Sequence, residues 1–201
     1  MIYTSEAIER LVGLLSSLPS IGRKTAQRLT YYILRQDEDF IKKLSESLLD
    51  LKQKVKYCSE CFNYTDSSPC VICCSDRRDE SIICVVAEPN DVVAIEKTND
   101  FRGRYHVLHG LLNPLEGVNV SDLKIKELIK RLQNVSEVIL AINPSVEGEI
   151  TIQYLYKIMQ PLNIKITRIA SGIPIGSAIE YSDEATLSRA LEARVTVSNQ
   201  N

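Results

Sequence analysis

The chain has 201 residues, of which 44% are hydrophobic and 25% are charged, an ordinary globular composition with enough apolar mass for a core. A formal net charge of −2 excludes a uniformly basic protein, so any contact with a polyanion must come from local charge. No basic segment followed by an apolar one occurs in residues 1–18, and no apolar run approaches a membrane span, so we expect no signal peptide and no membrane segment.

Two short amphipathic helices joined by a tight turn are predicted at the N-terminus. Apolar residues recur at helical spacing in residues 4–17, residues 18–22 break the pattern, and the spacing resumes from Arg23. Such a turn, together with the start of the second helix, presents free backbone N–H groups at which a phosphate can bind.

Basic side chains follow the second helix. Lys24 and Arg28 are four residues apart, Tyr31 and Arg35 continue roughly the same stripe, and Arg23 lies beside its start. Cations at this spacing, next to an anion-binding turn, predict a clamp for the backbone of a nucleic acid. The predicted DNA contacts are therefore Arg23, Lys24, Arg28 and Arg35.

Local charge supports this interpretation, because residues 1–56 contain ten Lys and Arg against seven Asp and Glu. The alternative is a packed helical hairpin with a soluble basic face. A nucleotide-binding P-loop is rejected, because Arg23 separates Gly22 from Lys24 and no strand precedes them.

A third helix, over residues 39–55, leads into two Cys-x-x-Cys pairs separated by eight residues. Each pair predicts a tight knuckle presenting two thiolates, and two knuckles close a four-sulfur shell around a structural zinc ion. The predicted ligands are Cys58, Cys61, Cys70 and Cys73. Cys74 could replace Cys73, and a redox pair, an iron–sulfur cluster or disulfides are the alternatives.

A disulfide framework is typical of short secreted chains, whereas this sequence has no secretory signal, so we expect a reducing, cytoplasmic compartment. Cys84 lies in a run of apolar, β-branched residues and is predicted to be buried in a strand.

The remaining sequence alternates apolar strands with amphipathic helices. Strands are predicted at residues 82–87, 105–108, 137–142 and 165–170, with helices through Val93 and Ile95, at 121–132 and at 145–159. This alternation predicts an α/β fold with a mostly parallel sheet. A loop then leads to a short helix capped by Ser182 or Asp183.

Three carboxylates follow predicted strands at the end where parallel sheets carry their functional groups. Glu88 ends the first strand, and Glu147 and Glu149 follow the third. Converging carboxylates could hold Mg²⁺ for phosphoryl transfer. Alternatively, Glu147 and Glu149 simply favour the first turn of a helix, where negative charge complements the dipole.

The order of these parts resembles the RecR family of bacterial recombination proteins. The likeness is carried by the Leu-Pro-x-Ile-Gly-x-Lys-Thr-Ala hairpin at residues 18–26, the four-cysteine finger, the strand ending at Glu88, and residues 105–108, 143–149 and 180–181. It implies a helix-hairpin-helix DNA-binding region at 1–56, a zinc finger at 57–80, a Toprim-like parallel α/β domain at 81–176 and a C-terminal arm for oligomer contacts at 177–201.

The resemblance also implies a function. RecR-like proteins are non-enzymatic, cytoplasmic DNA-repair proteins that form dimers and ring-shaped tetramers and act with RecO and RecF to load RecA. The expected activity is that of an oligomeric clamp at gapped or single-stranded/double-stranded DNA, associated with the nucleoid during repair and without a small-molecule substrate. Lys24 and Arg28 match the DNA-facing positions, whereas Glu88, Glu147 and Glu149 match a partner surface, expected to bind RecO.

Two positions depart from the related patterns. Ser20 replaces the Gly usual in such hairpins, and residues 143–149 carry only glutamates where catalytic Toprim enzymes have Asp-x-Asp. A Mg²⁺-dependent Toprim nuclease, primase or topoisomerase-like enzyme is the alternative function, and a protein adaptor without DNA contact is a third. His106 and His109 have no nucleophile nearby in sequence and are expected to be structural.

Overall fold

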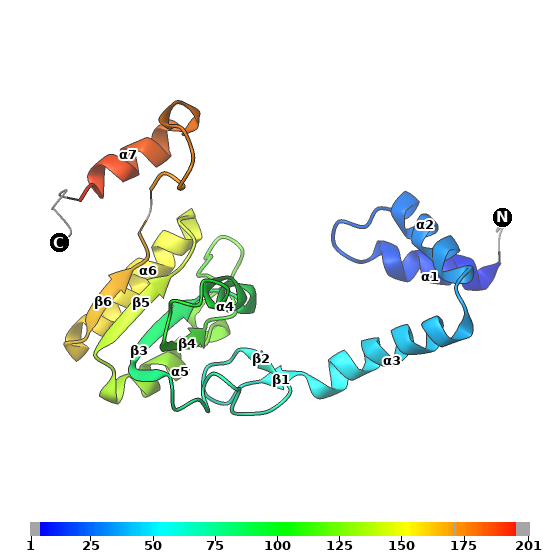
Figure 1. The fold of residues 1–201 in the computed structure, drawn as a ribbon, viewed down its shortest axis with the longest axis horizontal. Helices are drawn as coiled ribbons and strands as arrows, with labels where there is room; N and C mark the ends of the chain where they lie inside the picture. The colour runs from blue at the N-terminus through cyan, green and yellow to red at the C-terminus, as the bar shows by residue number, and fades with distance from the viewer. Residues whose placement is uncertain (1–4, 171, 196–201) are drawn as a thin grey trace. The chain divides into compact units, whose positions relative to one another are not determined.

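The computed structural model describes residues 5–170 and 172–195 and divides the chain into two compact units, Met1–Val55 and Lys56–Asn201 (Figure 1). The first unit is helical. The second combines a small two-stranded sheet with a four-stranded sheet and its helices. Within the described ranges, no helix combines the length and the apolar character that crossing a membrane requires.

The first unit begins with the predicted helical hairpin. Helix α1 spans Glu6–Ser16 and α2 spans Arg23–Leu34. Val12 of α1 and Ala26 of α2 are fully buried, and the small Ala26 side chain allows the two helices to pack closely. Thr30 is also buried, and its hydroxyl donates a hydrogen bond to the Ala26 carbonyl at 2.9 Å, so its polar atom has a partner.

The turn between α1 and α2 has a left-handed residue at position 20, although this residue is Ser rather than Gly. Ser20 has φ +64°, and Ile21 N donates to Leu18 O at 3.2 Å to close the turn. The left-handed conformation costs a non-Gly residue roughly 1–2 kcal/mol, which the hairpin packing has to offset. Ser20 therefore adopts the backbone conformation for which Gly is the usual residue.

Helix α3 spans Glu38–Lys54 and starts one residue earlier than expected, because the Asp37 carboxylate caps it by accepting from Phe40 N at 2.7 Å. No residue of this helix is buried within the described chain. Its apolar residues instead form an exposed row at helical spacing, which we call the α3 row: Phe40, Leu44, Leu48 and Leu51.

The second unit is built on a sheet of four parallel strands. These strands are β3 (Asp79–Val86), β4 (Gly103–Val107), β5 (Glu137–Ala141) and β6 (Lys165–Arg168), in the order β4-β3-β5-β6. The parallel α/β arrangement expected from the alternating pattern is confirmed. Strands β4 and β6 are the edges of the sheet.

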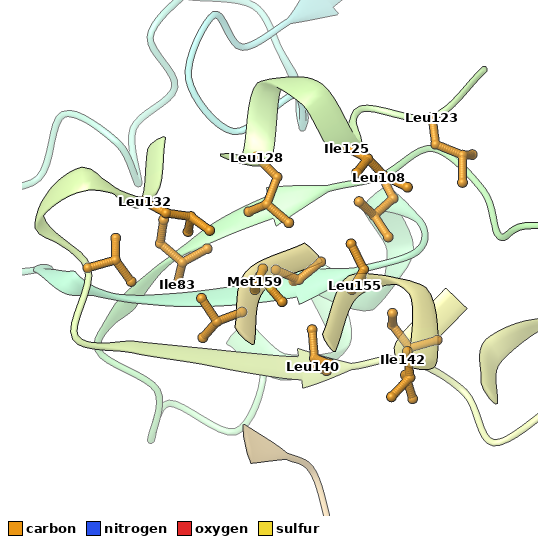
Figure 2. Close-up of a cluster of buried hydrophobic side chains, with 14 of the residues drawn as sticks. Ile83, Leu108, Leu123, Ile125, Leu128, Leu132, Leu140, Ile142, Leu155 and Met159 are labelled. Atoms are coloured by element: carbon orange, nitrogen blue, oxygen red, sulfur yellow. The ribbon is translucent and has the colours of Figure 1, made fainter. Parts of the chain in front are cut away.

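Alternation along the central strand β3 builds a core on each face of the sheet. Ile83 and Val85 pack with α5 (Ile125–Arg131) and α6 (Val146–Met159), whose buried side chains converge in Figure 2. Cys84 and Val86 point to the other face, where α4 (Pro89–Glu96) contributes the buried residue Val92. Cys84 is thus the buried strand residue that the sequence predicted.

The prediction of a helix over residues 121–132 is wrong for the first third of this range. A short 3₁₀ turn, Val120–Asp122, comes first, Leu123 is extended, and α5 begins only at Ile125. The break lets Lys124 N donate to Leu108 O at 3.1 Å just beyond β4, while Leu123 becomes buried. A tertiary contact therefore overrides the local helical pattern.

The C-terminal segment contains a 3₁₀ turn, Ile179–Tyr181, and α7, Glu184–Glu192. Asp183 caps α7 by accepting from Thr186 N at 2.9 Å, so Asp183 rather than Ser182 is the cap. The last part of the arm predicted at residues 177–201 lies outside the described residues from 196 onward.

Candidate functional site

Four buried cysteines converge near the start of the second unit. Their Sγ atoms all lie within 4.8 Å of one another, and the cysteines are Cys58, Cys61, Cys70 and Cys73. A tetrahedral zinc ion with Zn–S bonds of about 2.3 Å separates its sulfurs by about 3.8 Å, and the Cys61 and Cys70 Sγ atoms are 3.6 Å apart. The four sulfurs therefore fit one zinc ion with no open coordination position. Cys74 is exposed and outside this group.

The surrounding backbone favours thiolates. The Cys58 Sγ atom accepts from Cys70 N at 3.2 Å and from Glu60 N at 3.4 Å. Without a cation, contact with the Cys70 sulfur and burial raise the pKa of Cys61 to about 12, although other neighbours oppose this shift. Several adjacent thiolates thus require a compensating positive charge, which a divalent metal ion supplies.

The finger is held by a small antiparallel pair, β1 (Lys56–Tyr57) and β2 (Tyr64–Thr65), and it packs on the end of the edge strand β4. Val107 N donates to Cys61 O at 2.8 Å, and His109 Nε2 donates to Phe62 O at 2.7 Å. These two hydrogen bonds tie the first knuckle to the parallel sheet.

His106 is fully buried beneath the finger, with the Phe62 ring 5.4 Å away. Its Nε2 atom donates to Lys124 O at 2.7 Å, and Arg131 Nη1 donates to its Nδ1 atom at 3.0 Å. Because a guanidinium can only donate and a carbonyl can only accept, the imidazole is neutral with its proton on Nε2. Burial is the main reason that the pKa of His106 is lowered to about 3.

Acidification should therefore destabilise the protein through His106. Between its folded pKa of about 3 and its unfolded pKa of about 6.5, only the unfolded state binds the proton. The free energy of unfolding should fall as pH drops below about 6.5, approaching roughly 1.4 kcal/mol per pH unit. Urea unfolding from pH 7.5 to 5.5, with zinc content measured at each pH, tests this. His106→Gln should have a shallower pH slope, and equal slopes in both proteins would contradict the assignment.

The predicted cations gather on α2. Lys24, Arg28, Tyr31 and Arg35 line one shallow depression of the surface together with Gln27. Arg23 lies in the first turn, and its guanidinium pairs with the Glu9 carboxylate at 2.6 Å. Its charge is therefore partly neutralised, whereas the residues that line the depression present a basic groove.

The start of α2 suits an anion as well. Gly22 is its N-cap and has no side chain with which to cap the first-turn N–H groups, and that turn contains no acidic residue. The N-terminal end of the helix and the basic groove thus present positive charge on one element.

The three predicted carboxylates occupy the starts of two helices. Glu88 is the N-cap of α4, with its N–H bonded to the Asp91 carboxylate at 2.9 Å, whereas Glu147 and Glu149 lie in the first turn of α6. Glu149 also pairs with Arg168 at 3.3 Å. Among the described residues, the four cysteines are the only group of three or more His, Cys, Asp or Glu close enough to share a metal ion. The three glutamates are thus not gathered into a group of this kind.

Sequence reasoning missed the contacts that join distant segments. Arg131 binds His106 from 25 residues away, and the His109 ring lies against Tyr57 and Tyr64 of the finger. Two tyrosines flank the first Cys-x-x-Cys knuckle, so their pairing across two short strands could have been predicted. That a histidine packs against them follows only from the fold.

Comparison with known families matches almost every part of the chain. The matching models describe the RecR helix-hairpin-helix over residues 8–52, the RecR four-cysteine zinc finger domain over 55–75, a Toprim domain over 81–170, and the RecR C-terminal region over 172–195. The zinc finger match and the sulfur geometry together identify the cluster as a structural zinc site.

Curated relatives extend over nearly the whole chain. A protein of Chloroherpeton thalassium named Recombination protein RecR is 56% identical over 202 residues, covering 96% of this chain and 98% of the relative. A protein of the same name from Syntrophotalea carbinolica is 52% identical over 196 residues, with the same coverage of both chains.

Proposed function

Because the chain belongs to the RecR family of recombination proteins, we propose that it is a non-enzymatic mediator of recombinational repair that clamps DNA as an oligomer. In this proposal it acts with RecO and RecF to load RecA at gaps, in the cytoplasm and at the nucleoid during repair. The observation that carries the DNA-binding part is the basic groove on α2, within the segment that matches the RecR helix-hairpin-helix.

The proposed mechanism is positional. Lys24, Arg28 and Arg35 neutralise phosphates along one strand, while the free N–H groups at the start of α2 donate to a neighbouring phosphate. Contacts of this kind fix the protein on the backbone without reading bases, so binding does not depend on sequence. Arg23 contributes after exchanging its Glu9 partner for a phosphate.

The exposed α3 row supports oligomer formation. Leu48 and Leu51 are 62% and 64% exposed, although both lie on the apolar face of a 17-residue amphipathic helix. A contiguous apolar face of this kind is typical of an interaction site, and a second copy of the chain can present the same face. We propose that this contact, together with the C-terminal arm at residues 177–201, builds the dimer or the ring tetramer.

The carboxylates at the Toprim strand ends are proposed to recruit RecO rather than to perform chemistry. Their positions at helix starts, outside any shared metal-binding group of described residues, support this role. Replacing Glu147 and Glu149 with Gln should weaken RecO binding and leave DNA binding unchanged, which pull-down and anisotropy assays measure separately. Cleavage or religation of a nicked plasmid in Mg²⁺ or Mn²⁺ would favour a Toprim enzyme instead.

Reversing two charges in the groove should weaken DNA binding strongly. Fluorescence anisotropy of a labelled gapped duplex should show roughly ten- to a hundredfold weaker binding by a Lys24→Glu, Arg28→Glu double variant. The slope of log K against log salt should become shallower by about 0.9 for each phosphate that the variant no longer neutralises.

Lys126 and Lys130 provide a matched control, because they are exposed cations with the same four-residue spacing on α5, outside the helical unit. Reversing their charges should leave affinity and salt slope near those of the unmodified chain. Equally weakened binding by both variants would mean that general charge, not the groove, controls binding. No binding by the unmodified chain alone would favour the adaptor function.

A further inference from the structure

Two stacked tyrosines stand exposed on the zinc finger, and the proposed DNA contacts do not involve them. Tyr57 of β1 pairs directly with Tyr64 of β2, their ring centroids are 5.4 Å apart, and their planes differ by 18°. The stacking contributes to the pairing of the two strands, yet the side chains remain 49% and 53% exposed. The pair thus keeps about half of its aromatic surface accessible to the solvent.

The His109 ring packs against both tyrosines. The His109 ring lies 4.5 Å from the Tyr57 ring and 5.7 Å from the Tyr64 ring, between centroids. His109 has φ +61°, and its Nε2 atom donates to Phe62 O at 2.7 Å, which fixes the ring against the first knuckle. Little conformational entropy therefore remains to be lost when a ligand stacks on the tyrosines.

A carboxylate follows the strand end next to this surface. Gly110 N donates to Ala87 O at 3.1 Å, which holds the His109 segment beside the end of β3, where Glu88 follows. Since the adjacent His109 ring lies against both tyrosines, Glu88 follows a strand end that is tied to the segment packed on the aromatic pair. Tyr57 is the main cause that raises the pKa of Tyr64, and burial and the negative charge of Glu88 act in the same direction. Glu88 is exposed, so a cation can reach it from the solvent.

The surrounding charge favours a cation over a phosphate. Exposed Glu60 and Asp66 lie on the same finger, and residues 57–80 contain five Asp and Glu against two Lys and Arg. Lys56 precedes Tyr57, but neighbouring residues of a strand point to opposite faces. A nucleic-acid strand stacked on the tyrosines would thus bring its phosphates toward carboxylates.

We propose that Tyr57, Tyr64 and Glu88 form a binding site for an arginine side chain of a partner protein. A guanidinium is planar and stacks on an aromatic face while its N–H groups pair with a carboxylate, and an ammonium group matches this combination less well. This site would add a specific contact to the partner surface proposed above. It rests on the proposed function only because a partner protein has to supply the arginine.

Solution NMR of the full chain, labelled with ¹³C in its tyrosine rings, tests the site. The probes are the peptide acetyl-Gly-Arg-Gly-amide, its Lys counterpart and a ten-residue oligothymidine, with resonances assigned through Tyr57→Phe and Tyr64→Phe. We expect saturable shifts of both rings with the Arg peptide, at roughly three- to tenfold higher affinity than with the Lys peptide. Glu88→Gln and Tyr64→Leu should weaken binding, whereas Tyr64→Phe should retain it.

Absence of ring shifts with the Arg peptide would overturn the proposal, as would equal affinity for both peptides. If only oligothymidine shifts the ring resonances, the tyrosines form a base-stacking surface instead of an arginine site. The test is independent of the partner surface itself. If the Glu147→Gln, Glu149→Gln variant loses RecO binding but the Arg peptide shifts neither tyrosine ring, only the arginine site is refuted. Arginine binding combined with unchanged RecO binding in that variant would refute only the proposed role of the carboxylates.

Discussion

Cys61→Ser is expected to abolish stoichiometric zinc binding and to unfold the finger. The Cys61 sulfur is one of four that lie within 4.8 Å of one another, and a serine hydroxyl is a poor substitute for a thiolate ligand. Structural zinc contributes roughly 10–16 kcal/mol of apparent binding free energy in isolated finger peptides, so the loss of one ligand should remove most of the finger's stability. A chromophoric zinc assay on the unfolded protein gives the metal content per chain.

Cys74→Ser is the matched control, because Cys74 lies beside Cys73 but is exposed and outside the sulfur group. This variant should keep one zinc equivalent and the stability of the unmodified protein. Loss of zinc from Cys74→Ser would instead make Cys74 a ligand. A full zinc equivalent in Cys61→Ser would be incompatible with a four-thiolate centre.

Arg78→Ala should destabilise the second unit, because Arg78 organises a network just beyond the four clustered cysteines. Its guanidinium forms a two-pronged ion pair with Glu96 of α4, with one Nη1–Oε1 distance of 2.8 Å, and it donates to Phe101 O at 3.2 Å. The Tyr105 hydroxyl donates to the same carboxylate at 2.6 Å. Arg78 is also the main cause that lowers the pKa of Glu96.

Removing the guanidinium leaves the Glu96 carboxylate beside a buried tyrosine without its counter-charge. Breaking a fully buried pair costs about 3–5 kcal/mol, and the partial exposure of both side chains, 14% and 30%, reduces the expected loss to about 2–3 kcal/mol. Urea unfolding of the zinc-loaded protein measures this loss. Arg77→Ala, at the exposed neighbouring position, should change stability by less than about 0.5 kcal/mol.

A double variant that adds Glu96→Gln tests the cause. If the carboxylate's missing counter-charge explains the effect, Arg78→Ala should cost clearly less in the Glu96→Gln background than in the unmodified chain. An equal cost in both backgrounds would assign the effect to the carbonyl contacts of Arg78 instead.

The elements and sites that depend on local spacing were predictable from the sequence. Two Cys-x-x-Cys pairs define the zinc ligands, and helical periodicity places Lys24 and Arg28 of α2 along one depression with its C-cap, Arg35. Alternation of apolar strands with amphipathic helices likewise defined the parallel sheet. In each case the determining pattern lies within one segment or recurs regularly along the chain.

What escaped prediction depends on contacts between segments far apart in sequence. The helix expected at residues 121–132 is interrupted because Lys124 bonds to Leu108, and no local signal marks that bond. The neutral state of His106 likewise depends on its burial and on Arg131, both of which exist only after the chain has folded. Position after a strand suggested a magnesium site for Glu88, Glu147 and Glu149, but these residues lie at the starts of two helices and form no shared metal-binding group of described residues.

The docking of the zinc finger on β4 also bears on solubility. β4 is an outer strand of the sheet, and the hydrogen bond from Val107 N to Cys61 O occupies a backbone donor at its carboxyl end. An unoccupied outer strand is a template on which another chain can add a strand and start aggregation. Loss of the metal would therefore unfold the zinc finger and would also promote self-association of the remaining domain.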